Sequence, residues 1–360
     1  MAFDETESGV DEGKVLEALP DDLVASLEVR DGWRQEMAST SPALEFLVSH
    51  LALWPPGGAV RVAFLGGDAR LHHDIAEAAA QITDACNLSF DFGFDAGTGE
   101  ARRWNETDTT YAAEIRVSFD QPGFWSLVGT DSNDPTVGPP TGPIGGRPGQ
   151  RSLNLGGFVQ SRPPDWKGTV RHEFMHAVAF KHEHQNMRGP CEDQFRWDDE
   201  EGYVPTQDAR GRFVPDPAGR RPGIYTYLAG PPNKWPRAKV DHNLRTRDTP
   251  DTVASSFDAA SVMLYRFEPF FYRSVPSSCA PTTDGIDLSP GDTEGLRLLY
   301  PDVSEALDDI VKRGEAALAE LEAQVAIGRE STAETLPAAE SPYHERAAGL
   351  INATLDGIGR

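Results

Sequence analysis

Apolar and polar residues alternate in two short parts of the chain, which is the pattern of β-strands with one buried face. The first is residues 60–65 (VRVAFL) and the second is residues 113–119 (AEIRVSF). Between them, apolar residues recur at helical spacing over residues 69–85, and residues 90–94 predict a further short strand. The order strand, helix, strand, strand predicts a domain in which helices pack on a sheet.

The chain beyond this point is less regular. Residues 132–150 are so rich in proline and glycine that they exclude a regular element, and a short strand is expected just after them, at residues 152–156. A helix should start near residue 168. Beyond that helix, the acidic residues 191–221 predict a long surface loop or insertion, and residues 223–300 are irregular with short helical pieces.

The two ends of the chain are polar and helical in pattern. Near the start, one helix is predicted over residues 21–48, before the Trp-Pro-Pro sequence of residues 54–56. Near the end, residues 302–326 predict an amphipathic helix and residues 342–358 a weaker one. We therefore expect an acidic polar leader at residues 1–56, for which a pro-segment is one interpretation. The pattern then places a central domain at residues 57–301 and a helical extension at residues 302–360.

Composition and charge narrow the classes of protein that fit. With 39% hydrophobic and 25% charged residues, most of the 360-residue chain should fold. The net charge of −24 argues against a nucleic-acid partner, since phosphates require a basic face. No apolar run approaches the roughly 18 residues that span a bilayer. Three cysteines, Cys86, Cys191 and Cys279, allow one disulfide at most, and neither require nor exclude an oxidising compartment.

The stretch with the clearest chemistry is residues 172–184, HEFMHAVAFKHEH, which holds four of the nine histidines. On a helix, His172 and His176 lie one turn apart and face the same point. Glu173 lies about 100° further round, close enough to reach a metal-bound water without being a ligand. This is the HExxH arrangement of zinc hydrolases. A catalytic zinc needs a third protein ligand and an open position, and His182 can be that ligand if the chain turns after His176.

A solvated helix that happens to be rich in histidine is the alternative. The full pattern H-E-x-x-H-x-x-x-x-x-H would arise in roughly one random chain in two thousand of this length and histidine content. The zinc interpretation is therefore favoured. His184 lies two residues beyond His182 and should point elsewhere, so we expect it to be a surface or structural histidine.

The stretch resembles the zinc motif of the metzincin proteases, HExxHxxGxxH followed later by a Met-turn. It is most similar to the astacin-like branch, in which glutamate follows the third histidine. Residues 261–265 (SVMLY) match the S-x-M-H-Y form of the astacin-like Met-turn. Residues 124–131 (FWSLVGTD) and 286–300 are similar to other segments of such domains. The resemblance runs from about residue 55 to residue 301.

Two residues depart from the family pattern. Ala179 stands where the family has the glycine that lets the chain turn after the second histidine. If this turn has a left-handed backbone, a residue other than glycine costs about 1–2 kcal/mol. Leu264 replaces a histidine of the Met-turn, which is not a ligand in the pattern, so its loss changes little.

The resemblance implies an α+β fold, a metzincin-like zinc protease domain. Its upper subdomain would hold a twisted mixed sheet with the helix of residues 70–85 and the zinc helix packed on it. An irregular lower subdomain would begin after His182 and carry the Met-turn, with the active-site cleft between the two. The helices from residue 302 would be accessory, packing on this domain or binding a partner. The strand at residues 152–156 would be the edge of the sheet, to which an extended peptide could add.

The resemblance also implies roles for individual residues. One Zn²⁺ ion would be bound by His172, His176 and His182. Glu173 would be the general base, and Tyr265 would donate a hydrogen bond to the oxyanion or act as a displaceable ligand. Met263 would form an apolar floor beneath the histidines.

The predicted function is that of a zinc-dependent metalloendopeptidase acting on peptides or proteins. Two alternatives stay open: a non-catalytic binding protein on a decayed protease fold, and a zinc hydrolase of a non-peptide amide. Latency is also open, although residues 1–56 contain no cysteine that could block a zinc ion, and Asp68 is a poor match to an aspartate switch. Cys191 and Cys279 could pair.

The compartment and the oligomeric state are not fixed by the sequence. The start of this chain has no secretory signal, whereas proteins of the resembling family are mostly exported. Cytoplasmic location and export by a non-classical route are both compatible with these observations.

Overall fold

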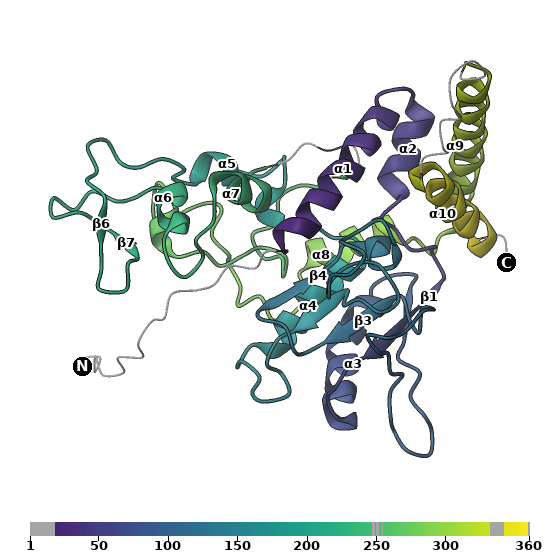
Figure 1. The fold of residues 1–360 in the computed structure, drawn as a ribbon, viewed down its shortest axis with the longest axis horizontal. Helices are drawn as coiled ribbons and strands as arrows, with labels where there is room; N and C mark the ends of the chain where they lie inside the picture. Colours follow the sequence, from purple (N-terminus) through teal and green to yellow (C-terminus); the bar gives the residue numbers. More distant parts are fainter. Residues whose placement is uncertain (1–18, 247–248, 250–251, 254, 332–341, 359–360) are drawn as a thin grey trace. The chain divides into compact units, whose positions relative to one another are not determined.

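A computed structural model describes residues 19–358, apart from residues 247–248, 250–251, 254 and 332–341. Helices and a mixed sheet occur together, so the predicted α+β class is confirmed (Figure 1). The contacts divide the chain into two compact units. The main unit holds residues 19–191, 246–266 and 278–360, and the inserted unit holds residues 192–245 and 267–277.

The main unit is built around a five-stranded sheet with the order β2-β1-β3-β5-β4. Four strands are parallel, and only β4 runs antiparallel to its neighbour β5. The strands are β1 (Ala59–Phe64), β2 (Ser89–Asp91), β3 (Ile115–Ser118), β4 (Phe124–Ser126) and β5 (Leu153–Leu155). The four strands predicted from alternation and composition are confirmed, and β4 is an addition to them.

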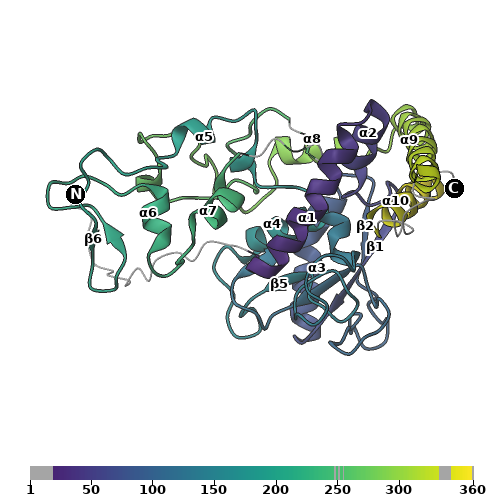
Figure 2. The same cartoon turned by 45° about the horizontal axis from the view of Figure 1, so that its top comes forward.

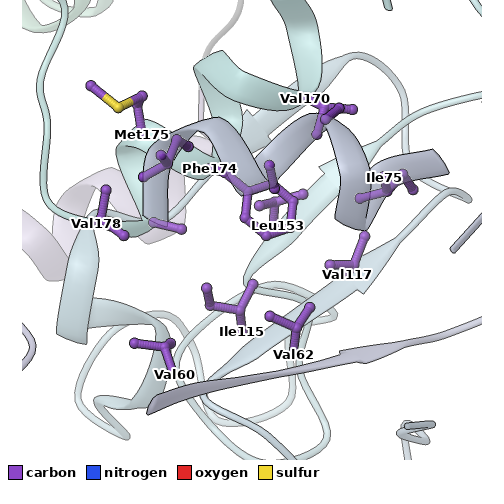
Figure 3. Close-up of a cluster of buried hydrophobic side chains, with 14 of the residues drawn as sticks. Val60, Val62, Ile75, Ile115, Val117, Leu153, Val170, Phe174, Met175 and Val178 are labelled. Carbon is purple, nitrogen blue, oxygen red and sulfur yellow. The ribbon is translucent and has the colours of Figure 1, made fainter. Parts of the chain in front are cut away.

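One face of the sheet is covered by α3 (Ala69–Thr83) and α4 (Trp166–Ala177), which also pack against each other. Figure 3 shows apolar side chains of the strands and of both helices meeting in this core, among them Val62, Ile75 and Phe174, each 0% exposed. Asp68 caps the start of α3, where its carboxylate accepts a hydrogen bond from the Leu71 amide at 2.8 Å. Asp68 is thus engaged as a helix cap.

The helix predicted over residues 21–48 is wrong in one respect, because two helices occupy this region. They are α1 (Asp21–Ala38) and α2 (Pro42–His50). Ser41 caps α2 by accepting a hydrogen bond from the Leu44 amide at 3.3 Å. Pro42 explains the break, since proline disfavours helical backbone in the residue before it and fits the first turn of the next helix.

The helices from both ends of the chain pack together in the main unit. The contacts join α2 to α9 (Ser304–Ser331) and α10 (Pro342–Ile358), and these helices lie side by side in both views (Figures 1 and 2). Their shared apolar cluster includes Leu44, Leu47 and Leu321. Both predicted C-terminal helices are confirmed. The division into leader, central domain and extension stays a prediction, while the contacts group residues 19–56, the parts of the central domain outside the inserted unit and the C-terminal helices in the main unit.

The inserted unit is mostly irregular, as predicted for residues 191–221 and 223–300. Its regular elements are α5 (Cys191–Gln194, whose first residue belongs to the main unit), the hairpin of β6 (Thr206–Gln207) and β7 (Phe213–Val214), α6 (Ile224–Ala229), α7 (Arg237–Leu244) and the 3₁₀ helix η3 (Pro269–Phe271). One turn is used twice, in the D-x-x-G-R sequences that start at Asp208 and Asp216. Within its turn, each aspartate accepts two backbone hydrogen bonds and pairs with the arginine four residues later. These turns order a segment that has little apolar core.

Cys191 and Cys279 form a disulfide, which confirms the pairing considered from the sequence. Both sulfur-bearing residues belong to the main unit, and Cys86 is a free, half-buried thiol. Within the part of the chain that is described, none of the helices has the length and apolar character needed to cross a membrane.

We expect the double variant Cys191→Ala/Cys279→Ala to lose about 2–4 kcal/mol of unfolding free energy. The reason is that the bond links residues 88 positions apart and so restricts the unfolded chain. Guanidinium chloride unfolding would measure the loss, with Cys86→Ala as a control that leaves the disulfide intact. Equal stability of the double variant and the wild type would contradict the prediction.

Candidate metal centre

Helix α4 supplies the first two histidines of the predicted site. His172 and His176 lie one turn apart on it, and both are buried. The Nδ1 atom of His172 lies 2.8 Å from the Val262 carbonyl oxygen, and that of His176 lies 2.7 Å from the Phe180 carbonyl oxygen. A carbonyl only accepts, so Nδ1 carries the proton in each ring and Nε2 keeps the lone pair that a metal needs.

The chain reverses directly after α4. Ala179 has φ 74°, so the left-handed backbone considered for this position is present in a non-glycine residue. The helix ends with hydrogen bonds from the Ala179 amide to the His176 carbonyl at 2.8 Å and from the Phe180 amide to the Met175 carbonyl at 3.0 Å. This is the usual closure of a helix by a left-handed residue. It turns the chain so that His182 can approach the helix.

Two buried aromatic side chains complete the end of α4. The indole Nε1 of Trp54 donates to the Ala177 carbonyl at 2.8 Å, and the Tyr300 hydroxyl donates to the Val178 carbonyl at 3.1 Å. Carbonyls at a helix end have no partner inside the helix and need one from outside. Burial raises the pKa of the Tyr300 hydroxyl, which therefore stays protonated and able to donate. Sequence reasoning missed both residues.

His182 meets the two helical histidines. Its Nε2 atom lies 3.1 Å from Nε2 of His176, and one nitrogen from each of the three rings lies within 4.8 Å of the others. In a tetrahedral zinc site, bonds of about 2.0–2.1 Å place two ligand nitrogens roughly 3.3 Å apart. The three imidazoles therefore fit a zinc ion. His182 is only half-buried, so the group is open to solvent on one side.

Glu173 follows His172 on α4 and is 2% exposed. It therefore lies on the same buried stretch of α4 as His172 and His176. The structure thus brings together the helix residues that the motif singles out.

The Met-turn, residues 261–265, is held in place by Asp292. The Asp292 carboxylate accepts from the Ser261 hydroxyl at 2.6 Å and from the Val262 amide at 2.9 Å. Asp292 also forms a capping box with Ser289 at the start of α8 (Pro290–Leu299). Because the Val262 carbonyl bonds to His172, Asp292 supports that ring from a distance. The SPGD sequence at residues 289–292 was the available signal for this cap.

Tyr265 stacks among the histidines. Its ring centroid lies 4.3 Å from that of His182 and 5.4 Å from that of His172. Met263, 1% exposed, lies in the apolar core of the main unit. By contacts the Met-turn belongs to the unit of the zinc helix and not to the irregular inserted unit.

His184 is a structural histidine and is not at the surface. It is 0% exposed, and its ring lies 5.0 Å from the ring of His182 and 5.3 Å from that of Tyr265. The expectation that it points away assumed regular helical or extended spacing. The short 3₁₀ helix η2 (Glu183–Gln185) instead brings it back beside His182.

The carboxylate of Glu183 stabilises the loop that contains His182 and His184. It accepts a hydrogen bond from the Asp258 amide at 2.8 Å and one from Asn186 Nδ2 at 2.9 Å. Burial raises the pKa of Glu183 to about 7. Together with the bond from the Glu183 amide to the Met263 carbonyl at 3.0 Å, these contacts join the third histidine to the Met-turn.

The predicted edge strand is wrong. Residues 153–155 form β5, which pairs with β3 on one side and β4 on the other, so it has no free edge for a peptide. The edge is β4. The Leu127 amide donates to Ser152, and the Gly123 carbonyl accepts from Gly156. Since backbone groups alternate along a strand, those of Phe124 and Ser126 point away from β5.

Comparisons with known proteins place this chain near several solved structures. Two structures of myroilysin resemble it, one at 24% identity and a TM-score of 0.47, covering 70% of this chain and 97% of that one. The other is at 21% identity and 0.39, covering 69% and 86%. A hatching enzyme zinc-protease from medaka fish, high choriolytic enzyme 1, resembles it at 16% identity and 0.38, covering 70% and 96%.

No protein-family model matches the chain, and no curated protein matches it in sequence. At these identities and TM-scores, the function of this chain has to be judged from the geometry of its own site.

We expect Ala179→Gly to raise the unfolding free energy of the metal-free protein by about 0.5–1 kcal/mol. Relief of about 1–2 kcal/mol of left-handed strain outweighs the roughly 0.4–1 kcal/mol that glycine costs through the unfolded chain. Chemical denaturation would measure the change. Ala177→Gly, in helical backbone two residues earlier, is the matched control and should destabilise by about 1 kcal/mol. A loss of stability in Ala179→Gly would contradict this account.

Proposed function

We propose that the chain is a zinc-dependent endopeptidase in which His172, His176 and His182 bind the metal. The observation that carries the proposal is the convergence of the three imidazoles, whose geometry fits a tetrahedral ion with one open side. The donor set supports this choice of metal, because three neutral imidazoles with an open position are typical of catalytic zinc.

When bound, zinc would lower the pKa of a coordinated water and polarise a substrate carbonyl. Glu173 is the general base of the proposal. It takes the proton of the attacking water and passes it to the leaving amine. The position of Glu173 directly after His172 on α4 supports this role, because it is that of the general base in the HExxH arrangement.

Tyr265 is the second catalytic residue of the proposal. Its ring is held against His182 and His172, which places the side chain within the histidine group. From there its hydroxyl donates a hydrogen bond to the oxygen that gains negative charge during attack on the peptide carbonyl. The same hydroxyl could instead be a displaceable ligand, and both roles require the stacked position.

Two other functions are tested by the same experiments. A decayed, non-catalytic fold is disfavoured because Glu173 and all three histidines are present and buried or half-buried together. A zinc hydrolase of small amides would share these residues. Product analysis with peptides and with small amides as separate substrates distinguishes it from an endopeptidase.

An oxidising compartment is part of the proposal. The Cys191–Cys279 disulfide supports it, because structural disulfides persist where thiols are not kept reduced. This favours export over the cytoplasm.

We expect Glu173→Gln to retain one zinc per chain while its rate of peptide cleavage falls about a hundredfold to ten-thousandfold. The amide keeps the size of the side chain but cannot accept the proton. Metal analysis and mass spectrometry of a digested peptide library would measure the two effects. His176→Ala, which should lose the zinc, is the complementary variant. Cleavage at the wild-type rate in Glu173→Gln would refute the assignment.

We expect Tyr265→Phe to lower kcat about a hundredfold with little change in KM or zinc content. Phenylalanine preserves the stacking on His182 and removes only the hydroxyl. Steady-state kinetics on one cleaved peptide would show the split. Tyr111→Phe removes a half-buried hydroxyl that contacts residues 133 and 146, and should leave kcat unchanged. An unaltered kcat in Tyr265→Phe would assign this tyrosine to packing alone.

A further inference from the structure

The segment before the first strand touches the zinc motif directly. Trp54 donates its indole hydrogen to the Ala177 carbonyl at the last residue of α4. Trp54 is 5% exposed, so water does not compete for this hydrogen bond. The contact spans 123 positions in sequence and ends two residues before the left-handed Ala179.

A second contact runs through Gly129, the first residue of the 3₁₀ helix η1 (Gly129–Asn133). Gly129 has φ 53°, and a Cβ added there would lie 1.8 Å from the Ala52 carbonyl oxygen and 3.0 Å from the Ala179 Cβ. Only glycine fits between these two residues. The Thr130 amide donates to the same Ala52 carbonyl at 3.0 Å. Residues 51–54 therefore contact η1, and η1 in turn lies against Ala179 in the turn after α4.

Buried charges fix η1 to helix α1. Arg30 is hydrogen-bonded to Asp131, and Arg34 lies 3.6 Å from the same carboxylate, with all three side chains 5–6% exposed. Burial alone would raise the pKa of Asp131, but the two arginines hold it below its usual value. Removing α1 would leave Asp131 as a buried charge without these partners, which is strongly unfavourable.

The apolar side of this segment is equally embedded. Leu23, Leu44 and Leu47 are each 0% exposed. Leu23 packs with Trp125 of the edge strand, whereas Leu44 and Leu47 pack with helices α9 and α10. Trp54 belongs to the core of the sheet itself, so the segment is packed against three different parts of the main unit.

We propose that residues 19–56 are a permanent part of the folded unit that positions the zinc-binding turn, with Trp54 as a positioning residue, and that they are not a removable inhibitory segment. The structural role of residues 19–56 is argued from their contacts alone. It rests on the proposed function only in that the turn is taken to position a zinc ligand. Tyr300 acts in the same way on the neighbouring carbonyl, of Val178. Neither aromatic residue touches substrate in this account.

The first test cuts the chain and leaves every residue in place. The recognition sequence of a site-specific protease is inserted after Gly57, an exposed turn residue, and the full-length protein is cleaved there. The expected result is that both fragments co-elute in gel filtration and that the zinc dissociation constant changes by less than about twofold. Release of the N-terminal fragment, with zinc affinity and peptide cleavage kept or increased, would overturn the proposal. The uncut insertion variant is the control.

The second test isolates one hydrogen bond. Trp54→Phe keeps an aromatic ring and removes the donor, and its zinc dissociation constant should rise about fivefold to tenfold. The absorption spectrum of the Co²⁺-substituted protein should also shift, because the third ligand is less well placed. Trp104→Phe is the matched control, since Trp104 is 1% exposed and donates to the Val117 carbonyl at 2.9 Å, within a separate cluster.

Trp104→Phe should lose comparable stability with unchanged zinc affinity and an unchanged cobalt spectrum. If Trp54→Phe binds zinc like the wild type, or if both variants weaken binding equally, Trp54 has no positioning role. Fragment elution and metal affinity do not depend on peptide cleavage. A protein that binds zinc as expected but cuts no peptide would therefore refute the proposed function and leave this inference standing.

Discussion

The reversal of the chain after helix α4 is the constraint on which the site depends. A helix can present two histidines at one point, but a third must come from chain that has turned back. The turn is made by Ala179 in left-handed backbone, which is unfavourable for alanine. The surroundings hold it there. Trp54 and Tyr300 bind the carbonyls of Ala177 and Val178, and Gly129 leaves just enough room beside Ala179.

The sequence pattern predicted those features that depend on residues close to one another in the chain. The alternation at residues 60–65 and 113–119 and the HExxH spacing each depend on residues that are close in sequence. They predicted the strands and the two helical histidines correctly. The break at Pro42 was also local, and its signal was overlooked. In contrast, the place of β5 in the middle of the sheet depends on long-range pairing, which no single stretch encodes.

The supports of the site were out of reach for the same reason. Trp54 and Tyr300 are ordinary aromatic residues in the sequence, and their role appears only when residues 123 and 122 positions away are brought to them. The sequence could predict Asp292 as a helix cap, but not that its carboxylate also accepts hydrogen bonds from the Met-turn. His184 was misplaced because a 3₁₀ turn changes the direction of side chains within two residues. Ligands can be recognised by spacing, whereas their supports are defined by the fold.

The packing of both chain ends against each other has a consequence for biosynthesis. Helices α1 and α2 leave the ribosome long before α9 and α10, yet α2 packs on both of them. Arg346 of α10 also donates a hydrogen bond to the Thr130 carbonyl at 2.7 Å. Thr130 belongs to η1, the 3₁₀ helix that lies against the turn at Ala179. A nascent chain therefore cannot complete this unit until α9 and α10 have been made. The turn at Ala179 would therefore gain its full set of supports only after α10 has been made, which makes the grouping of the three histidines a late event in folding.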